Sequence, residues 1–353
     1  MKMKKVAALS LAVAMAVGMM ACGNSGGSNS TTAQENLVTA ADGGTGAAAG
    51  DASYTINIGH FGSETTAVQM GCLAMKEYLE KESNGAITVN IYPNNSMGSD
   101  DELCQMVQNG NIEMTCANSI IVNYVPDAAI YDLFYNFSDI EDVKQKFMKD
   151  EKFLTVMRDV YAKAGFYLAG YSVHGFRLAT ANKPINSPED LQGMTFRVMQ
   201  NDYHIQGWQC MGATPTPFSF SELYTALQQG TLDAQENPVE TIYSAKLYEQ
   251  QKYISRTNHL QQTQQWLVNL DFYHNLPDEY KTMFDKAIAI CCETATNGAL
   301  EKEAEWSSEI KEFGCTFVDL TDDQREAFKE AVAPEWEAIK AGVDSAVWEA
   351  YTN

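Results

Sequence analysis

The chain has 353 residues and a formal net charge of −22 at pH 7, because 46 acidic residues outnumber 24 basic ones. Such a surface repels polyanions, so we expect no nucleic-acid partner and no direct binding to an anionic membrane surface. The five histidines never fall at metal-ligand spacing and no Cys-x-x-Cys occurs. We therefore expect neither a metal nor a cofactor.

The first 22 residues have the pattern of an export signal. Three lysines precede an apolar run, Val6–Met20, which is followed by Ala21-Cys22. The run is shorter than the roughly 20 residues that span a bilayer, and a small residue before Cys22 is typical of lipoprotein cleavage. We predict a lipoprotein signal peptide over residues 1–21, with Cys22 lipidated and the protein anchored outside the cytoplasm. The alternative is ordinary cleavage near Ala21, which would leave Cys22 as a free thiol.

Residues 22–52 are predicted to form a flexible tether. The stretch is rich in Gly, Ser, Thr and Ala and has no aromatic residue, so it buries too little apolar surface to offset the entropy of ordering. Loss of the three signal-peptide lysines leaves 21 basic against 46 acidic residues, a formal charge of −25. Seven cysteines remain besides Cys22, and an odd number argues against a complete disulfide framework.

Strand and helix patterns alternate from Tyr54 onwards. Tyr54–His60 alternates apolar and polar residues, Thr65–Ser83 has apolar residues at helical spacing, and Ile87–Tyr92 alternates again. A helix near residues 101–108, a strand near 114–117, a helix over about 141–164 and a strand near 167–172 follow. This order predicts an α/β fold with a mainly parallel sheet.

A second block of the same kind follows. Ser187-Pro-Glu-Asp190 predicts a capped short helix, and the next strand, Thr195–Met199, has Arg197 at its centre. Further elements are expected over 219–229, 232–235, 266–272, 278–313 and 316–320, with a final helix opened by Thr321-Asp-Asp-Gln324. We predict two lobes, residues 53–174 plus about 263–302 and residues 175–262 plus about 303–353. The helix over 278–313 would brace both.

Arg197 is the most informative single residue, because it lies between Phe196 and Val198 in an otherwise apolar strand. A buried guanidinium needs a partner. A salt bridge to an acidic side chain would satisfy it, and so would a forked contact with a ligand carboxylate. The residues alone favour the salt bridge.

The residues around Arg197 favour the other partner, a ligand carboxylate. The informative runs are Gly175-Phe-Arg177, Lys183-Pro-Ile185, Ser187-Pro-Glu-Asp-Leu-Gln-Gly193, Phe196-Arg-Val198, Gly212-Ala-Thr-Pro215, Glu222-Leu-Tyr-Thr-Ala-Leu-Gln-Gln-Gly230, Asp233-Ala-Gln-Glu-Asn-Pro238 and Tyr248-Glu-x-x-Lys-Tyr253 with His259. Together they resemble the substrate-binding subunits of tripartite ATP-independent periplasmic (TRAP) transporters, the DctP family. The resemblance implies a two-lobed periplasmic-binding-protein-like fold with a ligand cleft between the lobes. It also implies a small carboxylate solute and a membrane permease as partners.

The resemblance implies three ligand positions. Arg197 would make the bidentate carboxylate contact, Arg177 would support it, and Asn237 would donate a side-chain amide. Arg177 could instead form an interlobe salt bridge, and Asn237 could be a turn residue before Pro238.

Four weaker candidates face the same cleft by analogy. His60 and Glu64 follow the first strand, where open α/β sheets place ligands, and could bind hydroxyl groups of the solute. Phe220 could supply an apolar wall, and Gln200 could approach from the end of the Arg197 strand. Each could equally be a core or solvated residue.

Two other functions are alternatives to transport. An exported hydrolase would need a Gly-x-Ser-x-Gly elbow between a strand and a helix or a metal-binding His-Glu-x-x-His, and neither motif occurs over residues 53–353. A sensory protein that presents its ligand to a receptor would use the same cleft, so the sequence does not separate sensing from transport. Family members bind dicarboxylates, sugar acids, keto acids or sialic acid. His60 and Glu64, as candidate hydroxyl ligands, incline the prediction towards a sugar acid.

Overall fold

The computed structural model describes residues 53–352. The predicted signal peptide, Cys22 and the tether lie outside the described residues. None of the described helices is long and apolar enough to cross a membrane. The seven cysteines in this part of the chain are free thiols, and six of them are buried.

The first sheet has five strands. In spatial order they are β2 (Ile87–Tyr92), β1 (Tyr54–Gly59), β3 (Met114–Ala117), β10 (Gln261–Asn269) and β4 (Phe166–Phe176). The strands β2, β1 and β3 are parallel, whereas β10 runs antiparallel to both β3 and β4. Apolar side chains such as Ile56, Ile58 and Val89 are fully buried, as the predicted alternation requires.

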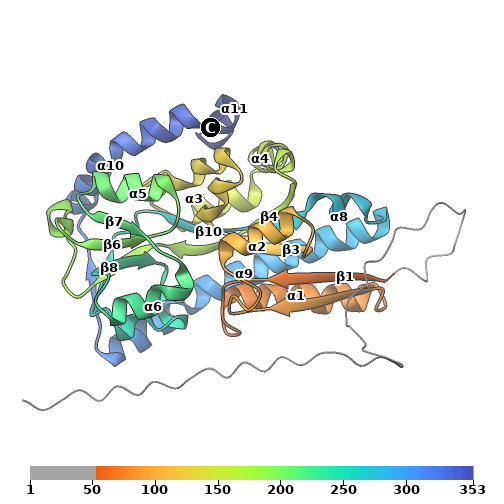
Figure 1. Cartoon of the computed structure of the whole chain (residues 1–353), viewed down its shortest axis with the longest axis horizontal. Coiled ribbons are helices and arrows are strands. Elements are labelled where there is room, and N and C mark those ends of the chain that lie inside the picture. The colour runs from red at the N-terminus through yellow and green to blue at the C-terminus, as the bar shows by residue number, and fades with distance from the viewer. Residues whose placement is uncertain (1–52, 353) are drawn as a thin grey trace, which may run out of the picture. The chain divides into compact units, whose positions relative to one another are not determined.

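The second sheet has six strands. In spatial order they are β11 (Thr316–Asp319), β9 (Tyr253–Arg256), β5 (Leu178–Ala181), β8 (Ala234–Asn237), β6 (Thr195–Val198) and β7 (Thr214–Pro217). Arg197 in β6 lies opposite Thr216 in β7. Figure 1 shows the strands β6, β7 and β8 in one half of the picture and β1 and β3 in the other.

Each sheet is mainly parallel, as predicted, but contains one strand that runs opposite to the others. The antiparallel pairings involve β10 in the first sheet and β5 in the second. The strand β4 passes straight into β5 through Arg177, and β9 leads through residues 257–260 into β10. A helix between two strands lets the chain return so that the second strand runs parallel to its neighbours. A chain that passes straight from one sheet into the other has no such helix, so its second strand runs antiparallel to its new neighbours. The two crossings are joined where the Arg177 amide donates to the Leu260 carbonyl at 2.8 Å.

Eleven α-helices are present in the described part of the chain. They are α1 (Ala67–Glu82), α2 (Asp100–Gln108), α3 (Ile140–Lys144), α4 (Glu151–Lys163), α5 (Asp202–Cys210), α6 (Phe220–Gln228), α7 (Val239–Ser244), α8 (Leu270–Asn275), α9 (Asp278–Phe313), α10 (Asp322–Gly342) and α11 (Ser345–Thr352). The helix predicted over residues 141–164 is broken. A π-helical turn (Gln145–Lys149) and Asp150 separate α3 from α4, and the Asp150 carboxylate caps α4 by accepting from the Phe153 amide at 3.0 Å.

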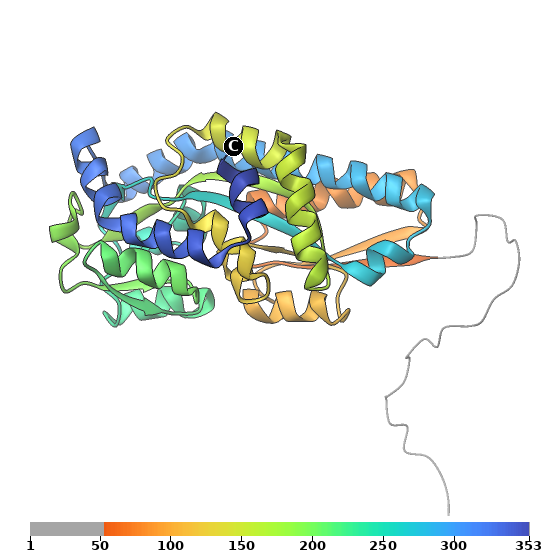
Figure 2. The same cartoon turned by 90° about the horizontal axis from the view of Figure 1, so that it is seen from above.

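The helix α9 packs against both sheets. It spans 36 residues, about 50 Å, as the sequence predicted. Its first half joins the apolar core beneath β1 and β2, while Trp306 and Ile310 join the core beside α6 and α7. The C-terminal helices connect the same two halves by another route, because α10 packs on α5 and α11 packs on α4 (Figure 2). The described fold is therefore two-lobed α/β with a long bracing helix. The exact lobe boundaries stay a prediction.

Candidate functional site

A cavity lies where elements of the two sheets meet. It encloses about 600 Å³, part of it open to solvent. Its lining from the first-sheet side is Phe61, Asn95, Ser99, Asp100, Asp101, Asn118 and Ile120. Its lining from the crossings and the second-sheet side is Arg177, Gln262, Arg197, Met199, Gln200, Phe218, Ser219, Phe220, Asn237 and Thr241.

Arg197 is buried in the cavity wall without a carboxylate partner. Its side chain is 3% exposed, and its Nε and Nη2 atoms donate to the Phe218 carbonyl at 3.0 and 2.8 Å. Within the part of the chain that the structure describes, Arg197 makes no ion pair, and its Nη1 donates to no protein acceptor. Burial lowers the pKa of Arg197 to about 10, although the charges of Glu236 and Asp100 oppose the shift. The guanidinium is therefore held in place by a neutral group and keeps donor capacity for a further acceptor.

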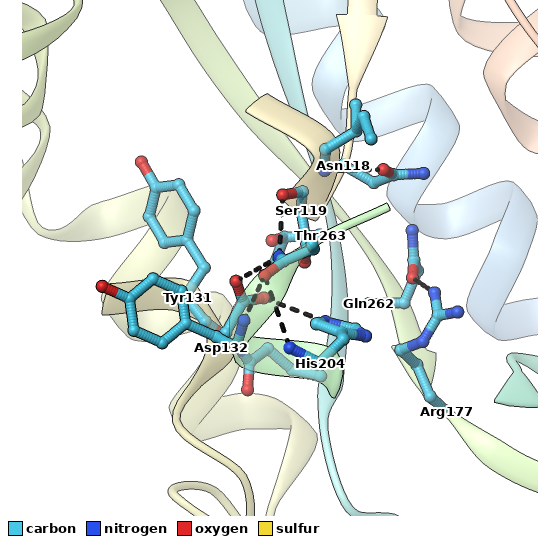
Figure 3. Close-up of polar contacts among 12 residues, drawn as sticks. Asn118, Ser119, Tyr131, Asp132, Arg177, His204, Gln262 and Thr263 are labelled. Carbon is cyan, nitrogen blue, oxygen red and sulfur yellow. Dashed lines mark hydrogen bonds and ion pairs between the residues drawn. The ribbon is translucent and has the colours of Figure 1, made fainter. Parts of the chain in front are cut away.

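Arg177 has a different environment. It is 2% exposed and makes a buried ion pair with Glu236 through Nε and Nη2, the latter at 2.7 Å. Its Nη1 donates to Gln262, a contact drawn in Figure 3, and its Nη2 lies 3.3 Å from the Asn237 Oδ1. His259 shares the same carboxylate, with Nε2 at 3.0 Å from Glu236 Oε2. A salt bridge of Arg177 is thus present, but it lies within the second sheet rather than between the lobes, because Glu236 belongs to β8 and Arg177 directly precedes β5, the strand paired with β8.

Glu236 is strongly stabilised as an anion by this cluster. Burial alone would raise the pKa of Glu236, but the charge of Arg177 and hydrogen bonds from His259 and Arg177 lower it well below its ordinary value. Burial in turn lowers the pKa of His259, against the opposing pull of Glu236. The charge of Arg177 is consequently balanced by the Glu236 carboxylate.

Three more predicted residues line the cavity. Asn237 is the last residue of β8 and 5% exposed, and its Nδ2 donates to Gln235 Oε1 at 2.6 Å. Phe220 begins α6 and meets the Phe61 ring edge-to-face, with centroids 6.1 Å apart. Gln200 follows β6, and its carbonyl accepts from Asn123 at 3.0 Å. Asn237 is therefore a strand residue rather than a turn residue.

His60 and Glu64 lie outside the cavity lining. His60 is fully buried, and its Nε2 lies 2.7 Å from Gln69 Oε1 on α1. Burial lowers the pKa of His60. Glu64 is solvent-exposed in the turn before α1. The rule that ligands gather after the first strand placed them in the right neighbourhood, but the contact with α1 takes the His60 ring away from the cavity.

The sequence reading missed the acidic wall of the cavity. Asp100 is the first residue of α2, and Ser99 and Glu102 form a capping box there. Burial raises the pKa of Asp100 to about 6, although the charge of Arg197 and the amide of Asn118 oppose this shift. Two signals could have found this wall: the Ser99-Asp-Asp-Glu102 cap after a strand, and Asn118 directly after β3.

Side-chain contacts beside the cavity join elements of the two halves. Glu240 of α7 accepts from the Ala67 amide at the start of α1 at 2.5 Å and pairs with His174 of β4 at 2.9 Å. Figure 3 shows the Asp132 carboxylate contacting His204, with Nε2 at 3.1 Å from Oδ1. The same aspartate accepts from Asn201, the N-cap of α5, at 2.7 Å. These buried contacts hold the cavity walls at their present separation.

Comparisons with known proteins agree with this geometry. The model of the bacterial extracellular solute-binding protein family 7 (DctP) matches residues 58–342. A solute-binding protein of Roseobacter denitrificans is 30% identical over 266 residues, which cover 75% of this chain and 82% of the relative. The fold is similar to that of a TRAP periplasmic solute-binding protein of Shewanella oneidensis with bound succinate, at a TM-score of 0.80 and 27% identity, over 85% of this chain and 98% of the other.

A second solved structure has a different ligand. It is a TRAP periplasmic solute-binding protein of Anaerococcus prevotii with bound D-glucuronate, at a TM-score of 0.81 and 26% identity, over 85% of this chain and 97% of the other. The family match covers most of the described fold, including both sheets and the cavity between them. The chain therefore belongs to family 7 of the bacterial extracellular solute-binding proteins, the binding subunits of TRAP transporters, and is a binding protein rather than an enzyme.

Proposed function

We propose that this protein captures a small organic acid outside the cytoplasm by a contact between Arg197 and the ligand carboxylate, and delivers it to a TRAP membrane permease. The observation that carries this proposal is a buried guanidinium that lines a cavity and has no carboxylate partner among residues 53–352. A buried cation is costly unless it is paired, so the site is energetically incomplete until an anion enters. Succinate and glucuronate, bound in two similar structures, both carry carboxylates.

The Phe218 carbonyl pre-orients Arg197 for this contact. Because Nε and Nη2 both donate to one oxygen, the plane of the guanidinium is fixed, and Nη1 is left without a protein acceptor in the described chain at a residue that lines the cavity. The Asn237 amide lies on the same side of the pocket as Arg197 and would supply a further donor to the carboxylate. The formal charge of the whole protein repels anions, but screening over about 8 to 10 Å leaves Arg197 in control of the local field.

We also propose that the cavity opens and closes by bending at the two direct crossings, β4 to β5 and β9 to β10. The Glu240 contacts to α1 and β4 join the walls when the cavity is closed, and a ligand that touches both walls would favour that state. Docking onto the permease would favour the open state and release the solute.

The membrane attachment belongs to the same proposal. Cys22 would carry the lipid, and the segment to residue 52 would act as a tether that keeps the binding domain near the permease. A Cys22→Ser variant should move from the membrane fraction to the soluble fraction and lose incorporation of labelled palmitate. Membrane retention of that variant would contradict the lipid anchor without affecting the binding proposal.

The binding proposal is tested with Arg197→Ala and a panel of carboxylates in isothermal titration calorimetry. Loss of a buried charged hydrogen-bonding partner costs about 2 to 5 kcal/mol, so affinity should fall by roughly 30-fold to several thousand-fold. Lys329→Ala, at an exposed position of α10, serves as the control and should bind as the wild type does. A change below about threefold for Arg197→Ala, or tight binding of uncharged sugars alone, would refute the proposed carboxylate contact.

A further inference from the structure

The cavity has two unlike walls. The second-sheet wall presents the Arg197 guanidinium, and the first-sheet wall presents oxygen acceptors from the loop before α2 and from its first turn, including Asn95, Ser99 and Asp100. Asp100 and Arg197 each shift the pKa of the other through their charges, yet they do not approach within ion-pair distance in the described structure. A ligand that bridges the two walls would meet Arg197 on one wall and these acceptors on the other.

Two acceptor atoms of the first-sheet wall have no donor within hydrogen-bond distance, although the Asn118 amide lies near enough to Asp100 to affect its pKa. Asp100 Oδ1 and Asn95 Oδ1 are both shielded from solvent, and neither has a hydrogen-bond partner within the described chain. Buried polar atoms are nearly always paired, and an unpaired acceptor on the wall of a cavity can be completed by a donor that enters the cavity. The neighbouring Asp101 differs, because its Oδ1 already accepts from the Tyr124 hydroxyl at 3.0 Å. Among the described residues that line the cavity, Asp100 and Asn95 are thus the two with a shielded oxygen that accepts no hydrogen bond.

Charge narrows the choice of ligand further. Arg177, the other cation in the lining, is neutralised by Glu236, which leaves Arg197 as the unpaired cation among the described lining residues. A ligand with two carboxylates would use Arg197 for one and place the other against the acidic wall. Like charges brought together in a desolvated site are strongly unfavourable. At neutral pH, Asp100 is ionised for the most part, because its pKa of about 6 lies below 7.

Resting on the proposed carboxylate capture, we propose that Asp100 is a specificity-determining residue that accepts hydrogen bonds from ligand hydroxyl groups and repels a second carboxylate. The solute is then a hydroxylated monocarboxylic acid, such as a sugar acid, rather than a dicarboxylate. The neutral acceptor Asn95 beside Asp100 fits several hydroxyl donors better than one compact ammonium group. An ammonium-bearing acid is the competing ligand for this wall.

The test compares three ligand classes in isothermal titration calorimetry with the mature protein at pH 7.5. D-Glucuronate and D-gluconate represent sugar acids, succinate and fumarate represent dicarboxylates, and β-alanine represents ammonium-bearing acids. The wild type should bind at least one sugar acid about tenfold or more tightly than either dicarboxylate. Tighter binding of a dicarboxylate or of β-alanine by the wild type would overturn the inference.

The decisive variant is Asp100→Asn, which keeps the shape and one acceptor but removes the charge. The ratio of sugar-acid to dicarboxylate affinity should fall by about tenfold or more, since repulsion of the second carboxylate is lost. Glu77→Gln removes the same charge from an exposed position of α1 and should leave the ratio unchanged within about threefold. An unchanged ratio in Asp100→Asn would also overturn the inference.

Failure of this inference is distinguishable from failure of the proposed function. Arg197→Ala reports on carboxylate capture and should weaken every acid that binds, whereas Asp100→Asn changes the order of preference. If Arg197→Ala abolishes binding and Asp100→Asn leaves the ratio intact, only the specificity role fails. Circular dichroism and thermal melting of both variants show whether each is folded before binding is measured.

Discussion

Arg177 and Arg197 are buried to nearly the same extent, at 2% and 3% exposure, yet they have different hydrogen-bond partners. Arg177 meets a carboxylate, a glutamine and an asparagine, and its partner Glu236 is further held by His259. Arg197 meets one backbone carbonyl. Facing it, Asp100 has a shielded oxygen with no donor among residues 53–352.

This difference indicates a structural role for Arg177 and a ligand-binding role for Arg197. A buried ion pair with several further hydrogen bonds fixes the place where the chain crosses between sheets, and its charge is already balanced by a protein carboxylate. A buried charge held by neutral groups is unstable by itself and gains its partner only on binding. Stability measurements on matched substitutions in the two regions should therefore give different answers.

The largest effect on stability is expected at Arg177. Arg177→Met leaves Glu236 buried beside His259 without its main counter-charge, and breaking a buried pair from one side costs about 3 to 5 kcal/mol. Urea unfolding of the ligand-free protein at pH 7.5 measures this loss. Adding Glu236→Gln to Arg177→Met should restore part of it, because no unpaired charge remains. Wild-type stability in Arg177→Met would mean that the cluster is not structural.

A smaller effect is expected at Asp100, and its sign depends on pH. Burial raises the pKa of Asp100 from 3.8 to about 6, so the folded protein binds this proton more tightly than the unfolded chain does. Wild-type stability is then relatively high below about pH 4 and is lost as pH rises through about 6. The loss is at most about 3 kcal/mol, and less because water enters the cavity.

The measurement is the difference in unfolding free energy between Asp100→Asn and the wild type at several pH values, without ligand. The variant cannot lose a proton at this position, so it should gain stability over the wild type between pH 4 and pH 7.5. Effects of the other carboxylates cancel in the difference. A difference that stays constant with pH would show that Asp100 is ordinarily solvated.

Much of the fold was predictable because its signals are local. The bounds of α9 follow from an acidic first turn after Pro277 and from Gly314, whose φ of +117° ends the helix. The break at Asp150 was missed, because a run of helix-forming residues hides a cap inside it. The strand β5 was also missed, and β10 was predicted only near residues 266–272 and without its antiparallel direction. Their direction is set by the crossing between sheets, which no local pattern records.

The residues of the candidate site also fall into those that the sequence predicted and those that it did not. Arg197, Arg177 and Asn237 were found through runs of residues that resemble a family, and all three line the cavity. Their energetic difference was not visible, since it depends on which side chain Glu236 faces. His60 was misplaced because its contact with Gln69 forms only once α1 packs. Asp100 was overlooked because an acidic residue at a helix start has a sufficient local explanation as part of a first turn.

The smallest effect on stability is expected at Arg197, and it is the sharpest contrast with Arg177. Arg197→Met removes two hydrogen bonds to the Phe218 carbonyl, which cavity water can replace, and it removes the cost of burying an unpaired guanidinium. These terms oppose each other, so the ligand-free unfolding free energy should change by less than about 1 kcal/mol.

Addition of ligand should reverse that near-equality of Arg197→Met and the wild type. A solute at 100 times its dissociation constant adds about 2.7 kcal/mol to the wild type and should add almost nothing to Arg197→Met. A loss above about 2 kcal/mol without ligand would give Arg197 the same structural role as Arg177. Equal stability without ligand and unequal stability with it would instead show that the fold tolerates this charge because the solute needs it.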